Sequence, residues 1–423
     1  MNLSIPMQIK TLRITLFILS LLVTIPVFSQ TMGNSISGVV IDRSSKKKLP
    51  GVTITVPNSN IAVVTNDDGT FQLKLPTDLE FSGIIAQQIG YHQTRLSPDY
   101  LESHNPVTIL MTRATHLLPE VTVKSGDPRK IIEEALRKIP SNYSSDKTMS
   151  SAFYRETVRK GNRYIAVSEA MVDVFKNSYR NRNTAGDKVQ LRKGRRLISQ
   201  KAADTLAVKI VGGPYMPVVL DVVKNEDVLL SINELDDYSF VMEEPEMLDD
   251  RFQHVIRFTP TVIRDYAMTS GKLFIDRETL SITRAEFSLD MKDKDKATAM
   301  MLYRKPRTLR FTPQEMSFVV NYKFSEGKSY LNYISTLTRF KCDWKRKLFS
   351  SPYVAFSELV IVDREDNPEE GIARKNAFGQ RDVFYDMVEN YWDPDFWNDY
   401  NIIEPTENLE KAVTKLRKTI KQN

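Results

Sequence analysis

Short strands separated by turn residues fill residues 36–75, and they constrain the fold of this chain more than any other feature. Short runs of strand-forming residues, most of them β-branched, recur about every ten residues, at 39–41, 52–56, 62–65 and 71–75. Proline, asparagine, aspartate and glycine lie between them, and closely spaced strands of this kind are typical of an antiparallel sandwich or barrel. Asp68-Gly69 predicts a hairpin turn, because these residues tolerate positive φ. We therefore expect a small β-sandwich.

Four pieces of this region resemble the carboxypeptidase regulatory-like domain, a transthyretin-like sandwich common at the start of Bacteroidetes-type envelope proteins. In these pieces glycines, prolines and strand residues fall in the order of that family; they are residues 36–42, 49–54, 65–71 and 89–91. The resemblance implies this sandwich fold, over residues 35–113, and an envelope location. It does not imply a peptidase.

The first 29 residues predict a secretory signal peptide. Lys10 and Arg13 precede an apolar run over 14–27, and Ser29 offers a small residue at the cleavage site. The apolar run is shorter than the roughly 20 residues that span a bilayer, so cleavage is favoured over a retained anchor. No cysteine near this site could carry a lipid. We expect an exported protein in the periplasm or at the periplasmic face of the outer membrane.

Composition sets wider limits on the chain. With 41% apolar residues it can bury a large core and form two or three domains. Its formal net charge of +6 is mild and gives no indication of a nucleic-acid partner. Cys342 is the only cysteine, which excludes an internal disulfide. It lies in an alternating stretch, so a buried strand residue is expected.

A second, β-rich domain is predicted over residues 127–403. Asp127 and Pro128 are good first residues for a helix over 128–139, which carries an apolar stripe until Pro140 ends it. Alternating patterns then predict antiparallel strands, including 164–175 and two hairpins; the hairpins are 272–276 with 281–289, and 318–324 with 330–344. The predicted fold class is mainly β: the sandwich followed by a large curved antiparallel sheet, half-barrel-like, with a few helices and one helix on its concave side.

Three further resemblances bear on function. Residues 117–124 are similar to the connector that follows the sandwich in nutrient-importing outer-membrane receptors, but about 300 remaining residues are too few for such a barrel. An accessory role in nutrient uptake stays open. Residues 151–157, with Tyr164 and Glu169, resemble Bacteroidetes envelope proteins in which a domain of unknown function follows the sandwich. Residues 271–280 resemble half-barrel lipoprotein carriers, which implies a concave apolar surface for acyl chains.

No catalytic motif is evident. The four histidines, His92, His104, His116 and His254, do not form a zinc-peptidase arrangement, and no nucleophile elbow or phosphate-binding glycine loop is present. We expect no enzyme activity, no cofactor and no metal site. The alternative is a hydrolase whose carboxylate pair assembles only in the fold, about 5 to 10 Å apart in an aromatic-lined cleft.

Two stretches are candidates for ligand contact. The basic residues of 188–196 predict either an edge strand, protected by positive charge, or a contact with an anionic surface; they are Arg192, Lys193, Arg195 and Arg196. The aromatic residues of 391–400 could stack on sugar rings or anchor the C-terminal segment onto the sheet; they are Tyr391, Trp392, Phe396, Trp397 and Tyr400.

An amphipathic helix is predicted to close the chain over residues 404–423, opened by Pro405. Together these features predict a non-catalytic exported envelope protein that binds or scaffolds. A partner protein at the sandwich and a lipid or glycan ligand at the sheet are the partners they favour.

Overall fold

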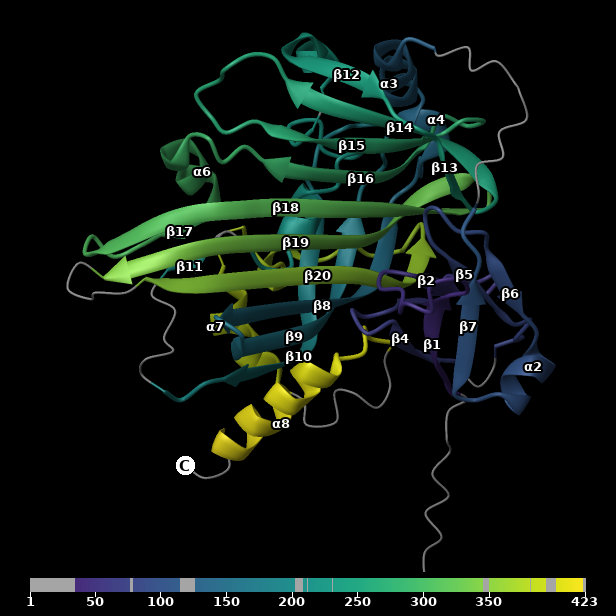
Figure 1. The fold of residues 1–423 in the computed structure, drawn as a ribbon, viewed down its shortest axis with the longest axis horizontal. Coiled ribbons are helices and arrows are strands. Elements are labelled where there is room, and N and C mark those ends of the chain that lie inside the picture. Colours follow the sequence, from purple (N-terminus) through teal and green to yellow (C-terminus); the bar gives the residue numbers. More distant parts are fainter. Residues whose placement is uncertain are drawn as a thin grey trace, which may run out of the picture.

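The computed structural model describes residues 35–76, 79–114, 126–201, 208–210, 212–229, 231–344, 350–380, 382–392 and 401–420. The predicted signal peptide lies outside these residues. No helix among them is both long and apolar enough to cross a membrane. The predicted mainly β class is confirmed, with a small sandwich beside a large antiparallel sheet (Figure 1).

The N-terminal sandwich consists of two facing sheets. One has the order β4 (Thr70–Lys74), β1 (Ser35–Asp42), β7 (Val107–Met111), and the other β3 (Ala62–Val64), β2 (Thr53–Thr55), β5 (Ile84–Gln87), β6 (Thr94–Leu96). The short helix α2 (Pro98–Ser103) precedes β7. Apolar residues of both sheets, including Ile54, Val63 and Leu73, form one buried core.

The prediction that the turn at Asp68-Gly69 joins two strands paired with each other is wrong. Gly69 has the expected positive φ of 68°, but β3 and β4 belong to different sheets. The turn therefore carries the chain from one layer of the sandwich to the other. A local turn signal fixes the backbone conformation at a reversal, whereas the partner of each strand is chosen by where its apolar face can be buried.

The large sheet is antiparallel throughout and has β10 at one edge and β12 at the other. Its order is β10 (Lys188–Ile198), β9 (Arg163–Lys176), β8 (Thr148–Lys160), β20 (Ser351–Asp366), β19 (Lys328–Trp344), β18 (Leu309–Ser325), β16 (Ile282–Leu289), β15 (Thr269–Asp276), β14 (Arg251–Pro260), β12 (Tyr238–Met242), with β13 (Glu246–Leu248) also paired to β14. Both predicted hairpins are present, as β15–β16 and β18–β19.

Helices and loops cover one face of this sheet, which we call the inner face. Asp127 caps α3 (Pro128–Arg137) as predicted, but Pro140 lies in the first turn of a second short helix, α4 (Ile139–Asn142), instead of ending the first. Proline is compatible with a first turn because its missing N–H has no helical acceptor there. The remaining elements on or near this face are β11 (Lys209–Ile210), α5 (Met216–Val219), η2 (Ile232–Asp237), α6 (Lys294–Met301), β17 (Leu302–Arg304), η3 (Arg374–Asn376), α7 (Phe384–Met387) and η4 (Val388–Tyr391).

The sandwich packs on the opposite, outer face. Along β3, Val63 points into the sandwich core, whereas Val64 joins a separate cluster with Phe153, Met171 and Val360 of the large sheet. Because side chains alternate between the two faces of a strand, the three residues of β3 can contribute both to the core of the sandwich and to the cluster with the large sheet. Hydrogen bonds accompany this contact, such as Asn60 Nδ2 to the Arg364 carbonyl (2.7 Å).

The C-terminal helix also lies on the outer face. Residues 404–406 precede it, and α8 spans Glu407–Ile420, so Pro405 stands just outside the helix. Its apolar stripe, including Leu409, Val413 and Leu416, packs against Val167 and Leu197 of β9 and β10. In Figure 1, α8 lies next to β10, and the sandwich lies further to the right.

Candidate functional site

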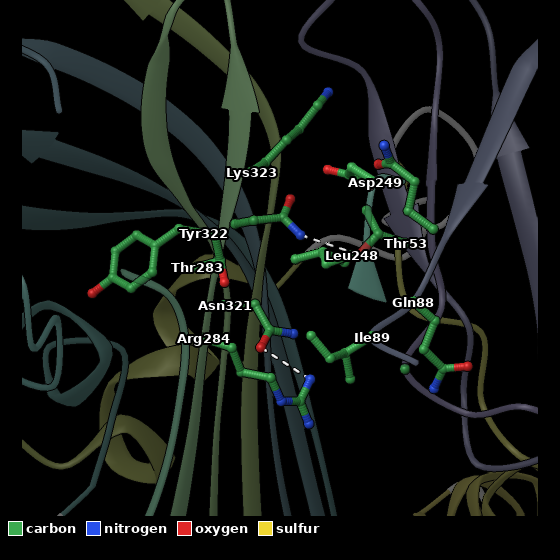
Figure 2. A pocket seen from close by; sticks show the side chains of 13 residues that line it. Thr53, Gln88, Ile89, Leu248, Asp249, Thr283, Arg284, Asn321, Tyr322 and Lys323 are labelled. Atoms are coloured by element: carbon green, nitrogen blue, oxygen red, sulfur yellow. Dashed lines mark hydrogen bonds between the residues drawn. The ribbon is translucent and has the colours of Figure 1, made fainter. Parts of the chain in front are cut away.

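A polar pocket lies where the sandwich meets the large sheet. Its walls come from β2 and the turn after β5 on the sandwich side, and from the β13–β14 turn, β16, β18 and β19 on the sheet side. The cavity volume is about 40 Å³. Figure 2 shows the side chains that line it, among them Gln88, Asp249, Asn321 and Lys323.

Two hydrogen bonds join side chains that line the pocket (Figure 2). Asn332 Nδ2 donates to Thr53 Oγ1 across the junction at 3.3 Å, and Arg284 Nη1 donates to Asn321 Oδ1 at 3.1 Å. Both bonds are held by strands that are themselves hydrogen-bonded on either side. Strands and turns of both domains therefore contribute to the pocket.

Asp249 and Lys323 line the upper part of the pocket as drawn in Figure 2, and Gln88 lines its lower right part. Asp249 lies in a turn with φ of 55°, and its Oδ1 is buried without a hydrogen-bond partner, as is Oε1 of Gln88. Burial raises the pKa of Asp249 to about 6. Burial also lowers the pKa of Lys323 to about 8, assisted by the charge of Arg364.

Perturbed acids and amines in a cleft are typical of functional sites, but the size of this pocket limits its chemistry. A cavity needs roughly 10 to 15 Å³ for each water molecule, so this one holds only a few. It could accept water or a small polar solute at Asp249, Gln88 and Lys323. An acyl chain or a sugar ring does not fit.

A buried ion network lies nearby, under the segment that leads to α8. Glu169 accepts from Arg155 Nε (2.7 Å) and Arg195 Nε (2.6 Å), and Arg155 also reaches Glu358 (3.2 Å) and the Ile403 carbonyl (2.6 Å). Burial acts to raise the pKa of Glu169, but the two guanidinium groups together lower it. Arg155 and Glu169 are two of the residues on which this chain resembles Bacteroidetes envelope proteins, and they are in contact in the folded protein.

A second buried network lies on the inner face. Asp221 accepts from Lys176 Nζ (2.7 Å) and from the hydroxyls of Tyr179 and Tyr322 (2.6 Å each). Burial acts to raise the pKa of Asp221, but Lys176 and these hydrogen bonds lower it. The Asp187 carboxylate lies 3.8 Å from the same lysine. The network is closed to solvent and joins the loops at 177–187 and 220–225 to the sheet.

These two networks hold pairs of carboxylates that a hydrolase could in principle use. In each pair a cation lies between the acids: Lys176 between Asp187 and Asp221, and Arg155 between Glu169 and Glu358. All four carboxylates are buried. Within the described residues no group of three or more His, Cys, Asp or Glu side chains is placed to hold a metal ion.

The predicted basic residues lie on β10, at an edge of the large sheet as one of the two interpretations requires. Arg195 is buried on Glu169, Arg192 pairs with Asp173 (2.5 Å), and Arg196 pairs with Glu389 and lies 4.6 Å from the centre of the Tyr385 ring. Lys193 is also engaged in a contact. Arg192, Arg195 and Arg196 thus pair with three different acids.

The predicted aromatic residues are described only in part. Tyr391 packs against the cluster formed by Tyr154, Phe384 and Val388, and Trp392 is about half exposed (53%) while its backbone bridges to Gly194. This arrangement fits anchoring of the segment onto the sheet. Phe396, Trp397 and Tyr400 lie outside the described residues.

Cys342 is buried on the inner face of β19, as its strand pattern predicts. Burial raises the pKa of its thiol to about 12. The thiol therefore stays protonated at neutral pH.

Comparison with known proteins agrees with the N-terminal part of this picture. Residues 36–123 match the family model of the CarboxypepD_reg-like domain. The match includes the sandwich and continues past its last strand, β7, and it leaves the large sheet outside the matched residues. Comparison with curated proteins found no match.

Two solved structures show a distant likeness. One is a DUF1329 family protein from Desulfovibrio piger, 12% identical, with a TM-score of 0.27; it covers 58% of this chain and 96% of the other. The second is a putative outer membrane lipoprotein-sorting protein domain from Vibrio parahaemolyticus, 13% identical, with a TM-score of 0.25; it covers 59% of this chain and 94% of the other.

The pocket residues carry no pattern that marks them in the sequence. Three of them, Gln88, Asp249 and Lys323, belong to segments far apart in the chain, and the residues next to each in the sequence form no recognisable motif. Asp249-Asp250 could have been read as a turn, since both residues have positive φ. The burial of Asp249 against the sandwich, however, depends on how the two domains dock.

Proposed function

We propose that this protein is a non-catalytic, exported cell-envelope protein that acts as a binding or scaffold module. The sandwich and the large sheet form its two docked parts. A carboxypeptidase regulatory-like sandwich without peptidase motifs supports an interaction role, and the predicted signal peptide supports export. The observation that carries the proposal most directly is the filled inner face of the large sheet.

That face is occupied by the chain itself. Ile132, Leu136 and Ile139 of α3 and α4 are buried in one cluster with residues of β15, β16, β18 and β19. Residues 218–235 and α6 add further side chains to the same cluster. A carrier of acyl chains needs this space, so the filled face favours scaffolding over the carriage of a lipid.

The sandwich has one side on which a partner could bind. β3 packs on the large sheet, and the backbone of Lys74 on β4 is held by Asn401 through two hydrogen bonds (2.6 and 3.0 Å). The side bearing β6 and α2 points away from the large sheet (Figure 1). A partner protein would meet the sandwich there.

Native mass spectrometry of the exported chain tests this function. The scaffold role predicts the mass of the polypeptide alone, and no lipid in a chloroform extract of the purified protein. A near-stoichiometric acyl lipid would overturn it in favour of a carrier.

The hydrolase alternative is tested with chromogenic glycosides and esters. The proposal predicts no turnover above the rate of a denatured sample. Turnover that is lost in Asp249→Asn would overturn the non-catalytic role and assign it to the pocket.

A further inference from the structure

The strands of the large sheet end in two very different regions. The sandwich contacts the end at which β18 finishes and β19 begins, through Lys323 and Asn332. At the opposite end lie residues 159–163, 261–268 and 290–310, which we call the distal end. Figure 1 shows α6 and β17 at this end, on the left, and the sandwich on the right.

The distal end is strongly basic although the whole chain has a mild charge. Residues 296–314 contain no acid, and lysine and arginine outnumber aspartate and glutamate in the three segments together. Arg304, Arg307 and Arg310 are exposed, and within the described part of the chain no side-chain contact ties them to an acid. The positive charge here is therefore available to an anionic partner.

Apolar side chains are exposed beside these cations. Ile263, in the β14–β15 loop, is 91% exposed, and Val262 and Tyr266 of the same loop are 39% and 45% exposed. Met300 of α6 is 42% exposed. Lys296 of α6 donates to the Arg264 carbonyl, which holds the helix against this loop. The exposed apolar residues of the loop therefore lie next to the helix that leads into the basic segment.

We propose that the distal end docks this protein onto an anionic phospholipid membrane. Clustered cations are attracted to lipid phosphates within a Debye length, which is about 10 Å at 0.1 M salt. Ile263 and Val262 would enter the boundary between headgroups and acyl chains, with Tyr266 at headgroup depth. An anionic polymer would satisfy the cations but would leave these aliphatic side chains in water.

A second basic cluster on the sandwich lacks the apolar component. Lys46, Lys47 and Lys48 are exposed in the turn after β1, and no large exposed apolar residue lies in that turn. This cluster provides a control with the same number of charges. The proposal concerns a surface separate from the pocket and the inner face, so it goes beyond the scaffold function.

Vesicle flotation with the full exported chain tests the proposal. The wild type should float with vesicles of phosphatidylcholine mixed with phosphatidylglycerol, less with phosphatidylcholine alone, and less at about 1 M salt, where the Debye length is about 3 Å. Arg304→Gln/Arg307→Gln/Arg310→Gln should lower the partition coefficient on the order of a hundred-fold, because each cation near the surface contributes several-fold. Val262→Ser/Ile263→Ser should lower it about tenfold.

The control variant is Lys46→Gln/Lys47→Gln/Lys48→Gln, which should partition within about twofold of the wild type. All substitutions are at exposed positions, and circular dichroism checks that each variant is folded. Equal losses in the control and in the arginine variant would overturn the proposal. So would the absence of flotation, including the case in which the protein binds heparin and not vesicles, which would assign the surface to an anionic polymer.

Discussion

At the scale of single residues, Asp249 couples the junction to pH. Asp249 lies in the β13–β14 turn at the junction with the sandwich, where burial raises the pKa of its carboxyl to about 6. The folded protein therefore holds this proton more tightly than the unfolded chain does, in which an aspartate has a pKa near 3.9. The stabilisation is complete below the unfolded pKa and is lost as the pH rises through about 6.

Asp249→Asn should consequently stabilise the protein at neutral and higher pH. Asparagine tolerates the positive φ of this position and carries no charge to bury. We expect a gain in the free energy of unfolding of about 1–2 kcal/mol at pH 8 and less at pH 5. Urea unfolding of both proteins at these two pH values measures the difference. An equal difference at both values would contradict the role of ionisation.

Glu169 is the residue on which the buried ion network depends. Its carboxylate is fully buried between Arg155 and Arg195. Glu169→Gln removes the buried carboxylate that Arg155 and Arg195 share and leaves Arg155 with Glu358 as its remaining acid, and we expect a loss of about 3–5 kcal/mol in the free energy of unfolding. Denaturant titration gives this value.

Arg339→Gln serves as the control for this change. Arg339 pairs with Glu315 at 2.9 Å, but both side chains are close to half exposed. Its removal should cost less than about 1 kcal/mol. A loss for Glu169→Gln as small as that of the control would show that the network is not a source of stability.

At the scale of elements, local patterns predicted strands well and their partners less well. Alternating residues identified β16 and β19 because one face of each is buried. The Asp68-Gly69 reversal was identified too, but not the change of sheet that it makes. Strand pairing depends on segments distant in sequence, such as β1 with β7 and β8 with β20.

The C-terminal helix gives a test at this scale. Leu409 is buried against β9 and β10, whereas Lys411 points into solvent. Leu409→Ala should weaken the docking of α8 by about 2–4 kcal/mol, because it removes a buried side chain and leaves a cavity. Hydrogen exchange of residues 407–420 should become faster. Lys411→Ala should change it little, and equal rates in the two variants would argue against docking through this stripe.

At the scale of the whole molecule, the sandwich and the sheet are expected to act as one unit. Val64 fills an apolar cluster with residues of β8, β9 and β20, and a separate contact is made at β13, where Gly90 N donates to the Met247 carbonyl (2.6 Å). A protease site introduced between residues 114 and 126 should therefore yield two fragments that co-elute on gel filtration after cleavage.

Val64→Asp should separate the two fragments. The side chain faces the large sheet and not the sandwich core, so a buried charge there opposes docking while the sandwich stays folded. Circular dichroism of the isolated fragment checks its fold. Separation of the wild-type fragments, without any substitution, would show that the interface is too weak to join the two parts.

The sequence by itself determined the sandwich, the strand-rich second domain, the capped helix after Asp127 and the apolar stripe of α8, because each depends on residue spacing within one segment. Tertiary structure decided what lies on each face of the large sheet. It filled the inner face, paired Arg192, Arg195 and Arg196 of β10 with different acids, and brought Gln88, Asp249 and Lys323 into the lining of one pocket. Burial and proximity arise between segments far apart in the chain, and no local pattern records which segments will meet.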